Sequence, residues 1–211
     1  EAAISSVTFT FDSDAPTAGI TYPISLPLSQ GNLKALTEVS GTAREQFVIK
    51  SASVSFQETD SLLYYDVQGG SFTSPTQKWI TAAIGNLGAN YTYTWSITGG
   101  AVPPLRDNKN YNIQVVAGDM TGNVMPPSAA TIIRYDITPP LSRTVTPLHG
   151  SFLNNFASVT GTAQDQNSNP SGASGTESRI QRSGLASGNG EYWNGAIWGG
   201  AEVWLNPVGG S

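Results

Sequence analysis

Few residues in this chain have the types and spacing that catalysis or zinc binding needs. His149 is the only histidine, and the 211-residue sequence contains no cysteine. A catalytic triad or a zinc site requires further histidine or cysteine partners within reach. We therefore interpret His149, in the run His-Gly-Ser, as a surface turn residue. No set of acid, base and nucleophile can be assembled, so we expect a protein that is not an enzyme.

Carboxylates near the expected domain ends offer a second kind of chemistry. They are Asp12, Asp14, Asp119 and Asp136. Calcium favours such oxygen-rich positions, whereas aspartate is also an ordinary turn residue whose side chain caps backbone amides. No D-x-[DN]-x-[DN]-G loop is present. Calcium at these four residues therefore stands as an alternative to turn capping, and we expect no other cofactor.

A group of aromatic residues near the C-terminal end could bind sugars. Tyr192, Trp193, Trp198 and Trp204 are interspersed with glycines that would leave their faces open. The alternative is that these rings fill a β-sandwich core. Aromatic residues recur at matching positions earlier in the chain, which favours packing. The earlier set comprises Tyr64, Tyr65, Phe72 and Trp79.

The elements that would position these residues are short β-strands. The chain has 23 glycines, 13 prolines and only 12% charged residues, and no segment shows a helical apolar period. Alternation and turn residues predict eight strands, near residues 20–26, 36–43, 47–57, 62–68, 77–84, 91–97, 111–118 and 130–136. The last two form a hairpin. Its turn spans Asp119 to Asn123, where we expect Gly122 and Asn123 to take positive φ.

Charge and composition exclude several classes of partner. The net charge is −5 without a basic run, which argues against nucleic acid. No apolar run approaches the roughly 20 residues of a membrane span. The absence of cysteine in a Thr/Ser/Asn-rich β protein fits an extracellular bacterial protein better than a disulfide-bonded eukaryotic one.

Two motifs resemble bacterial immunoglobulin-like and fibronectin-III-like tandem repeats of extracellular surface or adhesin-type proteins. Leu105 and Tyr111 resemble a tyrosine corner, in which a buried phenol bonds to backbone upstream. Ala117, Asp119, Gly122 and Asn123 (A-x-D-x-x-G-N) resemble the end of the penultimate strand in such repeats. The resemblance implies an all-β fold of tandem Greek-key sandwiches. It also implies a structural, non-catalytic role as a cell-surface stalk, adhesin shaft or filament.

The chain contains an internal repeat. The V-x-G-T-A run that begins at Val39 recurs 120 residues later at Val159. At the same offset, Leu33 matches Leu153, Leu36 matches Phe156 and Pro27 matches Pro147. Phe11-Asp12 matches Tyr135-Asp136 at an offset of 124. We therefore expect a terminal strand in residues 1–16, one complete repeat in residues 17–137 and a partial repeat in residues 138–211. The partial repeat lacks counterparts of the strands near 91–97, 111–117 and 132–135.

An unfinished sandwich leaves strand edges unpaired, which natural proteins rarely tolerate. Two explanations are open: the sequence is an excerpt of a longer repeat array, or a neighbouring molecule supplies the missing strands. In the second case the candidate donor residues are Val7, Phe9 and Phe11. The expected partners are therefore copies of the chain itself or adjacent repeats. A carbohydrate-binding module that recognises cell-surface glycan is the alternative function.

Overall fold

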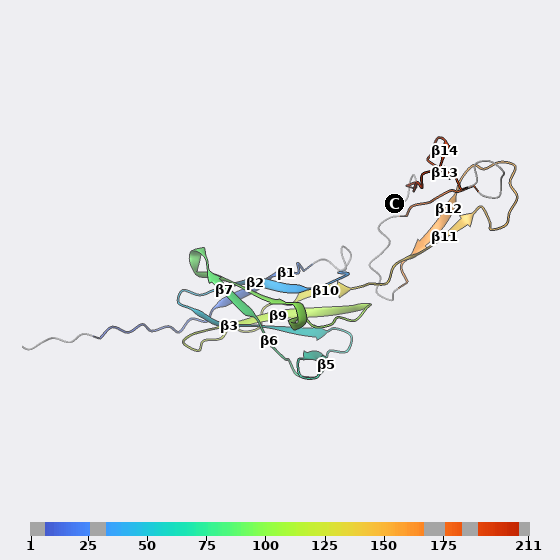
Figure 1. Cartoon of the computed structure of the whole chain (residues 1–211). Helices are drawn as coiled ribbons and strands as arrows, with labels where there is room; N and C mark the ends of the chain where they lie inside the picture. Colours follow the sequence, from blue (N-terminus) through green and yellow to red (C-terminus); the bar gives the residue numbers. More distant parts are fainter. Residues whose placement is uncertain (1–6, 26–32, 167–175, 183–189, 207–211) are drawn as a thin grey trace, which may run out of the picture. The chain divides into compact units, whose positions relative to one another are not determined.

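The computed structural model describes residues 7–25, 33–166, 176–182 and 190–206. The chain divides into two compact units, with the change from the first to the second between Ile137 and Thr138 (Figure 1). Nearly all the regular structure in both is antiparallel strand.

The first unit is a sandwich of two antiparallel sheets. One sheet has the order β1 (Thr17–Tyr22), β2 (Glu38–Arg44), β8 (Thr92–Thr98) and β7 (Ala83–Leu87). The other has the order β10 (Thr131–Tyr135), β9 (Lys109–Asp119), β3 (Ile49–Glu58), β4 (Tyr64–Asp66) and β5 (Ser71–Ser74), with β6 (Ile80–Thr81) also pairing with β3. Two short 3-10 turns, η1 (Ala89–Tyr91) and η2 (Gly99–Ala101), flank β8. The chain changes sheets between β2 and β3, between β6 and β7 and between β8 and β9, and the expected all-β immunoglobulin-like fold is confirmed.

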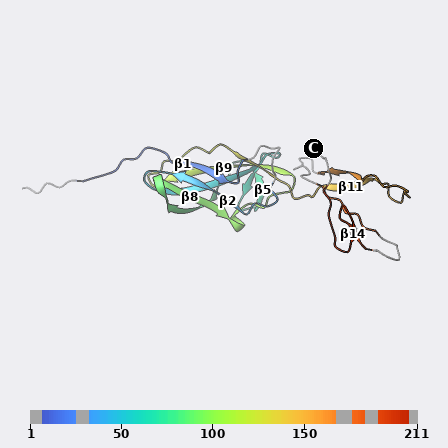
Figure 2. The same ribbon diagram turned by 90° about the horizontal axis from the view of Figure 1, so that it is seen from above.

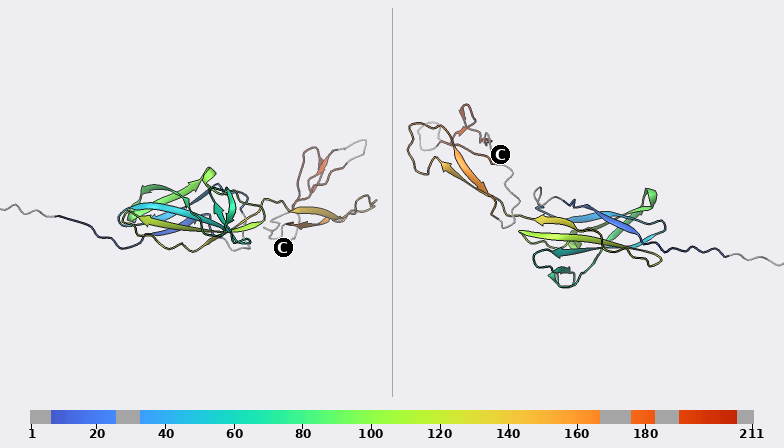
Figure 3. Two further views of the ribbon diagram at one scale, coloured as in Figure 1. Left: turned by 90° about the horizontal axis from the view of Figure 1, so that it is seen from below. Right: turned by 180° about the vertical axis from the view of Figure 1, so that it is seen from behind.

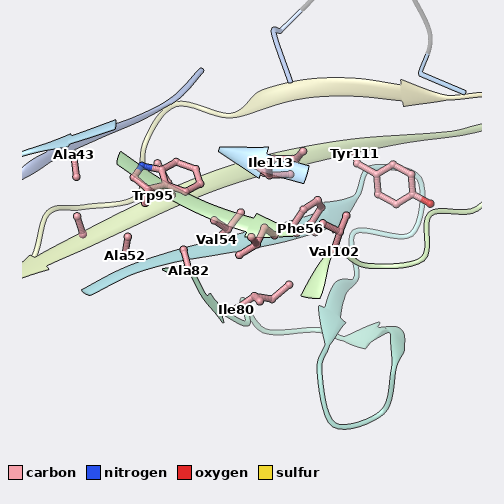
Figure 4. Packing of buried hydrophobic residues seen from close by; sticks show 14 of the residues in the cluster. Ala43, Ala52, Val54, Phe56, Ile80, Ala82, Trp95, Val102, Tyr111 and Ile113 are labelled. Carbon is pink, nitrogen blue, oxygen red and sulfur yellow. The ribbon is translucent and has the colours of Figure 1, made fainter. Parts of the chain in front are cut away.

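Alternating side chains explain why these strands form and what they bury. In β8, Tyr93, Trp95 and Ile97 are buried, whereas Thr94 and Ser96 between them are more exposed. In β9, Tyr111, Ile113, Val115 and Ala117 face inward in the same way. Together with Val54 and Phe56 of β3 they fill the space between the sheets (Figure 4). The core of the molecule lies in this unit.

The sequence predicted most of these strands but not how they divide between sheets. The expected strand 77–84 is two strands: β6 pairs with β3 in one sheet, and β7 pairs with β8 in the other. The chain changes sheets at Ala82 between them. Strand β5 was not predicted. The expected hairpin is present, because β10 pairs with β9 from Thr131↔Ile113 to Tyr135↔Lys109.

The second unit contains smaller strands. β11 (Leu141–Thr146) pairs with β12 (Thr160–Gln164), and β13 (Tyr192–Trp193) pairs with β14 (Trp198–Gly199). Every residue of β11 and β12 is exposed. No helix among the described residues is long and apolar enough to cross a membrane.

The segment before the first unit is extended. Residues 7–16 carry no assigned strand, and Figures 2 and 3 show them as a trace that leaves the sandwich. The expected strand at Val7–Phe11 therefore has no strand partner among the residues that the structure describes. Pro27, which the sequence pairs with Pro147, lies outside the described residues. Pro147 directly follows β11, as Pro23 directly follows β1.

Candidate functional site

The turn after β9 is held by Asp119. Its Oδ1 accepts hydrogen bonds from the Thr121 hydroxyl at 2.9 Å and from the Gly122 and Asn123 backbone amides at 2.7 and 2.8 Å. Its Oδ2 accepts one from the Asn123 side-chain amide at 2.8 Å. Burial alone would raise the pKa of Asp119, but these hydrogen bonds outweigh it and hold the pKa below its ordinary value.

The positive φ expected in this turn occurs at Gly122, with φ of 102°, and not at Asn123. The expectation for Asn123 was wrong, because this residue acts through its side chain. Its amide donates to Asp119 and, at 3.4 Å, to the backbone carbonyl of Asp12. The turn therefore also contacts the segment that precedes the first unit.

The four carboxylates proposed for calcium do not gather at one place. The Asp12 backbone carbonyl accepts a hydrogen bond from the Asn123 side chain in the Asp119 turn. The Asp14 amide donates to the Asp12 carboxylate at 3.1 Å. Asp136 follows Tyr135, which pairs with Lys109 at the other end of β9. Within the described ranges, no three acidic or histidine side chains form a group that could hold a metal ion. The contacts of Asp119 are those of a turn cap, and calcium stays a prediction.

Tyr111, near the start of β9, bonds to the loop that precedes this strand. Its side chain is fully buried, and its hydroxyl accepts a hydrogen bond from the Arg106 amide at 2.8 Å. Leu105, half-buried, packs against the core beside it. Burial raises the pKa of the Tyr111 phenol to about 12. This is the geometry of a tyrosine corner, which ties the loop to the sandwich.

The aromatic residues of the second unit form a cluster with two arginines. Trp193 and Trp198 are neighbours across the β13–β14 pair, with ring centroids 5.5 Å apart and planes tilted by 57°. The Arg179 guanidinium lies over the rings of Tyr192 and Trp204, at 5.5 and 5.1 Å. Arg182 lies over Trp198 at 5.0 Å. One face of three rings is thus occupied by a cation, and the rings do not form a single flat platform.

This cluster has an equivalent in the first unit. Tyr65 and Phe72 are neighbours across the β4–β5 pair, with ring centroids 5.4 Å apart and a tilt of 60°. There Phe72 is buried and also contacts Tyr111, at 5.0 Å. The match supports packing as the role of the second pair, while glycan binding by Tyr192, Trp193, Trp198 and Trp204 stays a prediction.

The second unit repeats the strand pairings of the first. The β11–β12 register, from Leu141↔Gln164 to Thr146↔Thr160, copies the β1–β2 register from Thr17↔Arg44 to Tyr22↔Ser40, including an irregularity before its last pair. The bridge Gln181↔Tyr192 copies Gln57↔Tyr64 between β3 and β4. The bridge Ser178↔Leu205 copies Val54↔Ile80 between β3 and β6. Residues 178–182 are therefore the counterpart of the end of β3.

Sequence reasoning missed this counterpart because Gln57 and Gln181 are the only identical residues in the matched segments 54–58 and 178–182. The matched V-x-G-T-A runs were visible, but not the reason for their glycine. A Cβ on Gly41 would lie 2.0 Å from the Gly19 carbonyl oxygen and 2.4 Å from the Trp95 ring. A Cβ on Gly161 would lie 2.5 Å from the carbonyl oxygen of Arg143, the residue equivalent to Gly19. Close backbone approach therefore requires glycine in both units.

The proposed strand-donor residues are exposed. Val7, Phe9 and Phe11 have exposed fractions of 88%, 83% and 80%. At an offset of 124, Phe9 matches Ile133 of β10, which is 4% exposed. His149 is exposed in its turn, where the Ser151 amide donates to the Leu148 carbonyl. No acid or base lies among the contacts described for it.

No protein-family model matches this chain, and no curated protein matches it significantly. It is similar to a solved structure of Clostridium thermocellum CbhA fibronectin(III)-like modules, at 22% sequence identity and a TM-score of 0.28. That match covers 92% of this chain and 80% of the other. The strand order of the first unit establishes its fold, a β-sandwich of the immunoglobulin and fibronectin-III type.

Proposed function

We propose that this chain is a structural, non-catalytic repeat segment of a bacterial surface stalk, adhesin shaft or filament outside the cell. The observation that carries the proposal is the repeated register: β11 and β12 pair as β1 and β2 do, and residues 178–182 bridge as β3 does. Tandem sandwiches transmit length and force through backbone ladders and need no reactive site.

Strand exchange between copies is part of this proposal. The exposed apolar residues Val7, Phe9 and Phe11 and the fully exposed strands β11 and β12 support it. A head-to-tail contact whose rotation does not close into a ring produces an open filament.

Negative-stain microscopy of the full chain and of a variant lacking residues 1–14 tests the exchange. We expect end-to-end assemblies from the full chain and single particles from the truncated chain. Circular dichroism and amide NMR serve as controls and should show the first unit still folded. Equal assembly by both chains would contradict strand donation by the N-terminal segment.

Glycan binding is the second candidate function. Trp204, with an exposed fraction of 52%, is the observation that favours it, since one ring face remains available for stacking. A glycan array on the full chain and on Trp204→Ala separates the two functions. Binding that is lost in the variant, with the first unit unchanged, would support a carbohydrate-binding module.

A further inference from the structure

The outer edge of β12 corresponds to an edge that is occupied in the first unit. There β2 pairs with β8 through Val39↔Ile97, Gly41↔Trp95 and Ala43↔Tyr93. The matching stretch of the second unit, residues 159–163, is exposed throughout, and β12 pairs only with β11 among the described strands. Its outer backbone groups therefore have the geometry for another antiparallel strand.

This edge also has space for an aromatic ring. In the first unit the Trp95 ring packs directly on Gly41, where a Cβ would come within 2.4 Å of the ring. Gly161 likewise has no side chain and lies close to the backbone of the neighbouring strand β11. In the part of the chain that the structure describes, Gly161 is exposed. An incoming strand could place a ring there as β8 does.

Residues 7–11 have the side-chain pattern that this position needs. They read Val-Thr-Phe-Thr-Phe, so apolar residues alternate with hydroxyl-bearing ones as in β8, where Tyr93, Trp95 and Ile97 face inward. The three apolar side chains of the segment are at least 80% exposed. With Phe9 opposite Gly161, Val7 meets Ala163 and Phe11 meets Val159.

A donor strand in the place of β10 would form fewer backbone pairs with the second unit. Residues 7–11 match β10 in sequence. In the first unit, β10 pairs mainly with β9, over five residue pairs. Its pairing with the residues before β2 is a single bridge at Leu33. No strand equivalent to β9 is described in the second unit. The edge of β12 offers a ladder of about five pairs and is therefore favoured.

A donor from a second copy fits the reach of the segment within the first unit. Asp12 is held at the Asp119 end of β9, whereas the chain leaves the first unit at the Lys109 end. An 11-residue strand separates these ends by about 34 Å. The five residues 7–11 extend at most about 18 Å from Asp12, so they do not reach the Lys109 end, where the chain continues toward the second unit.

We propose that residues 7–11 of one copy add to the outer edge of β12 in a second copy, antiparallel and in the place of β8, with Phe9 packed on Gly161. This inference rests on the proposed strand exchange and specifies its acceptor. It makes the second unit the receptor for the N-terminal segment of the next copy.

Disulfide trapping tests the register on the full chain, which has no native cysteine. In the proposed ladder Thr8 lies opposite Thr162, as Thr94 lies opposite Thr42 in the first unit. Chains carrying Thr8→Cys are mixed with chains carrying Thr162→Cys and oxidised. We expect a disulfide-linked heterodimer, because opposed Cα atoms in antiparallel strands lie about 4.5–5.5 Å apart.

Thr42→Cys is the matched control acceptor. Thr42 is the exposed equivalent of Thr162, but β8 already occupies its edge. We expect loss of the heterodimer when Thr42→Cys replaces Thr162→Cys. Equal trapping at both positions, or none at Thr162, would overturn the proposal. A disulfide between Phe11→Cys and Leu153→Cys instead would show that the donor takes the place of β10. That result would overturn β12 as the acceptor but would still support strand exchange.

Discussion

The two units share their strand registers but differ in what covers them. In the first unit, Val39 and Ala43 of β2 are at most 1% exposed, because β8 pairs with β2 and the core cluster packs against them. In the second unit, Val159 and Ala163 occupy the same positions and are exposed. The difference shows that local pattern and close-packed glycine set the register of a hairpin, whereas burial depends on the strands that complete the sandwich.

Replacement of the matched glycines should affect the two units differently. Gly41→Ala places a Cβ against the Gly19 carbonyl and the Trp95 ring, so we expect the first unit to lose more than about 4 kcal/mol of folding free energy or to fail to fold. Gly161→Ala should disrupt the β11–β12 pair and leave the first unit unchanged within about 0.5 kcal/mol. Denaturant unfolding followed by the amide NMR signals of β9 measures both effects. Equal losses in the first unit would contradict the comparison.

Trp95 and Trp198, one in each unit, should differ in how much they contribute to the stability of the first unit. Trp95 is 2% exposed in the core, so Trp95→Ala should cost about 3–5 kcal/mol. Trp198 is half-buried and packs against Trp193 and Arg182, so Trp198→Ala should leave the unfolding of the first unit within about 0.5 kcal/mol of the parent chain. Chemical denaturation of the full-length variants tests this. A large loss of first-unit stability in Trp198→Ala would mean that the units depend on each other.

Tyr111→Phe removes the hydrogen bond from the Arg106 amide and should cost about 1 kcal/mol. The raised pKa of Tyr111 also predicts a pH dependence. Between about pH 10 and about pH 12 the unfolded tyrosine loses its proton and the folded one retains it, so stability falls as pH rises. This component of the alkaline loss should be absent in Tyr111→Phe. An unchanged alkaline profile in the variant would assign the loss to other groups.

The Asp119 turn should give the smallest effect and the opposite pH dependence. Because its folded pKa is lowered, Asp119 contributes stability above its unfolded pKa, and the contribution is lost as pH falls through the folded pKa. Asp119→Asn should weaken that acid dependence. Acid titration of unfolding free energy, with the exposed Asp14→Asn as a control, measures the difference. Equal profiles for Asp14→Asn and Asp119→Asn would contradict the turn-cap role.

The sequence predicted the strands with clear alternation and the hairpin of β9 and β10. It did not separate β6 from β7, since a period of two residues does not reveal that Ala82 marks a change of sheet. It identified the glycine of both V-x-G-T-A runs but not the Trp95 ring that packs on Gly41, a contact between β2 and β8. The counterpart of β3 at residues 178–182 is recognised by its pairing partners and not by its residues.

Amide hydrogen exchange in the full chain, measured by NMR at a concentration where it is monomeric, tests whether the second unit keeps the register of the first with one edge open. In β2 the amides that point toward β1 and those that point toward β8 should both be protected. In β12 we expect protection only of the amides that point toward β11, with rapid exchange of those on the outer edge. Protection of both sets in β12, or of neither, would contradict an open edge on a second repeat of the same register.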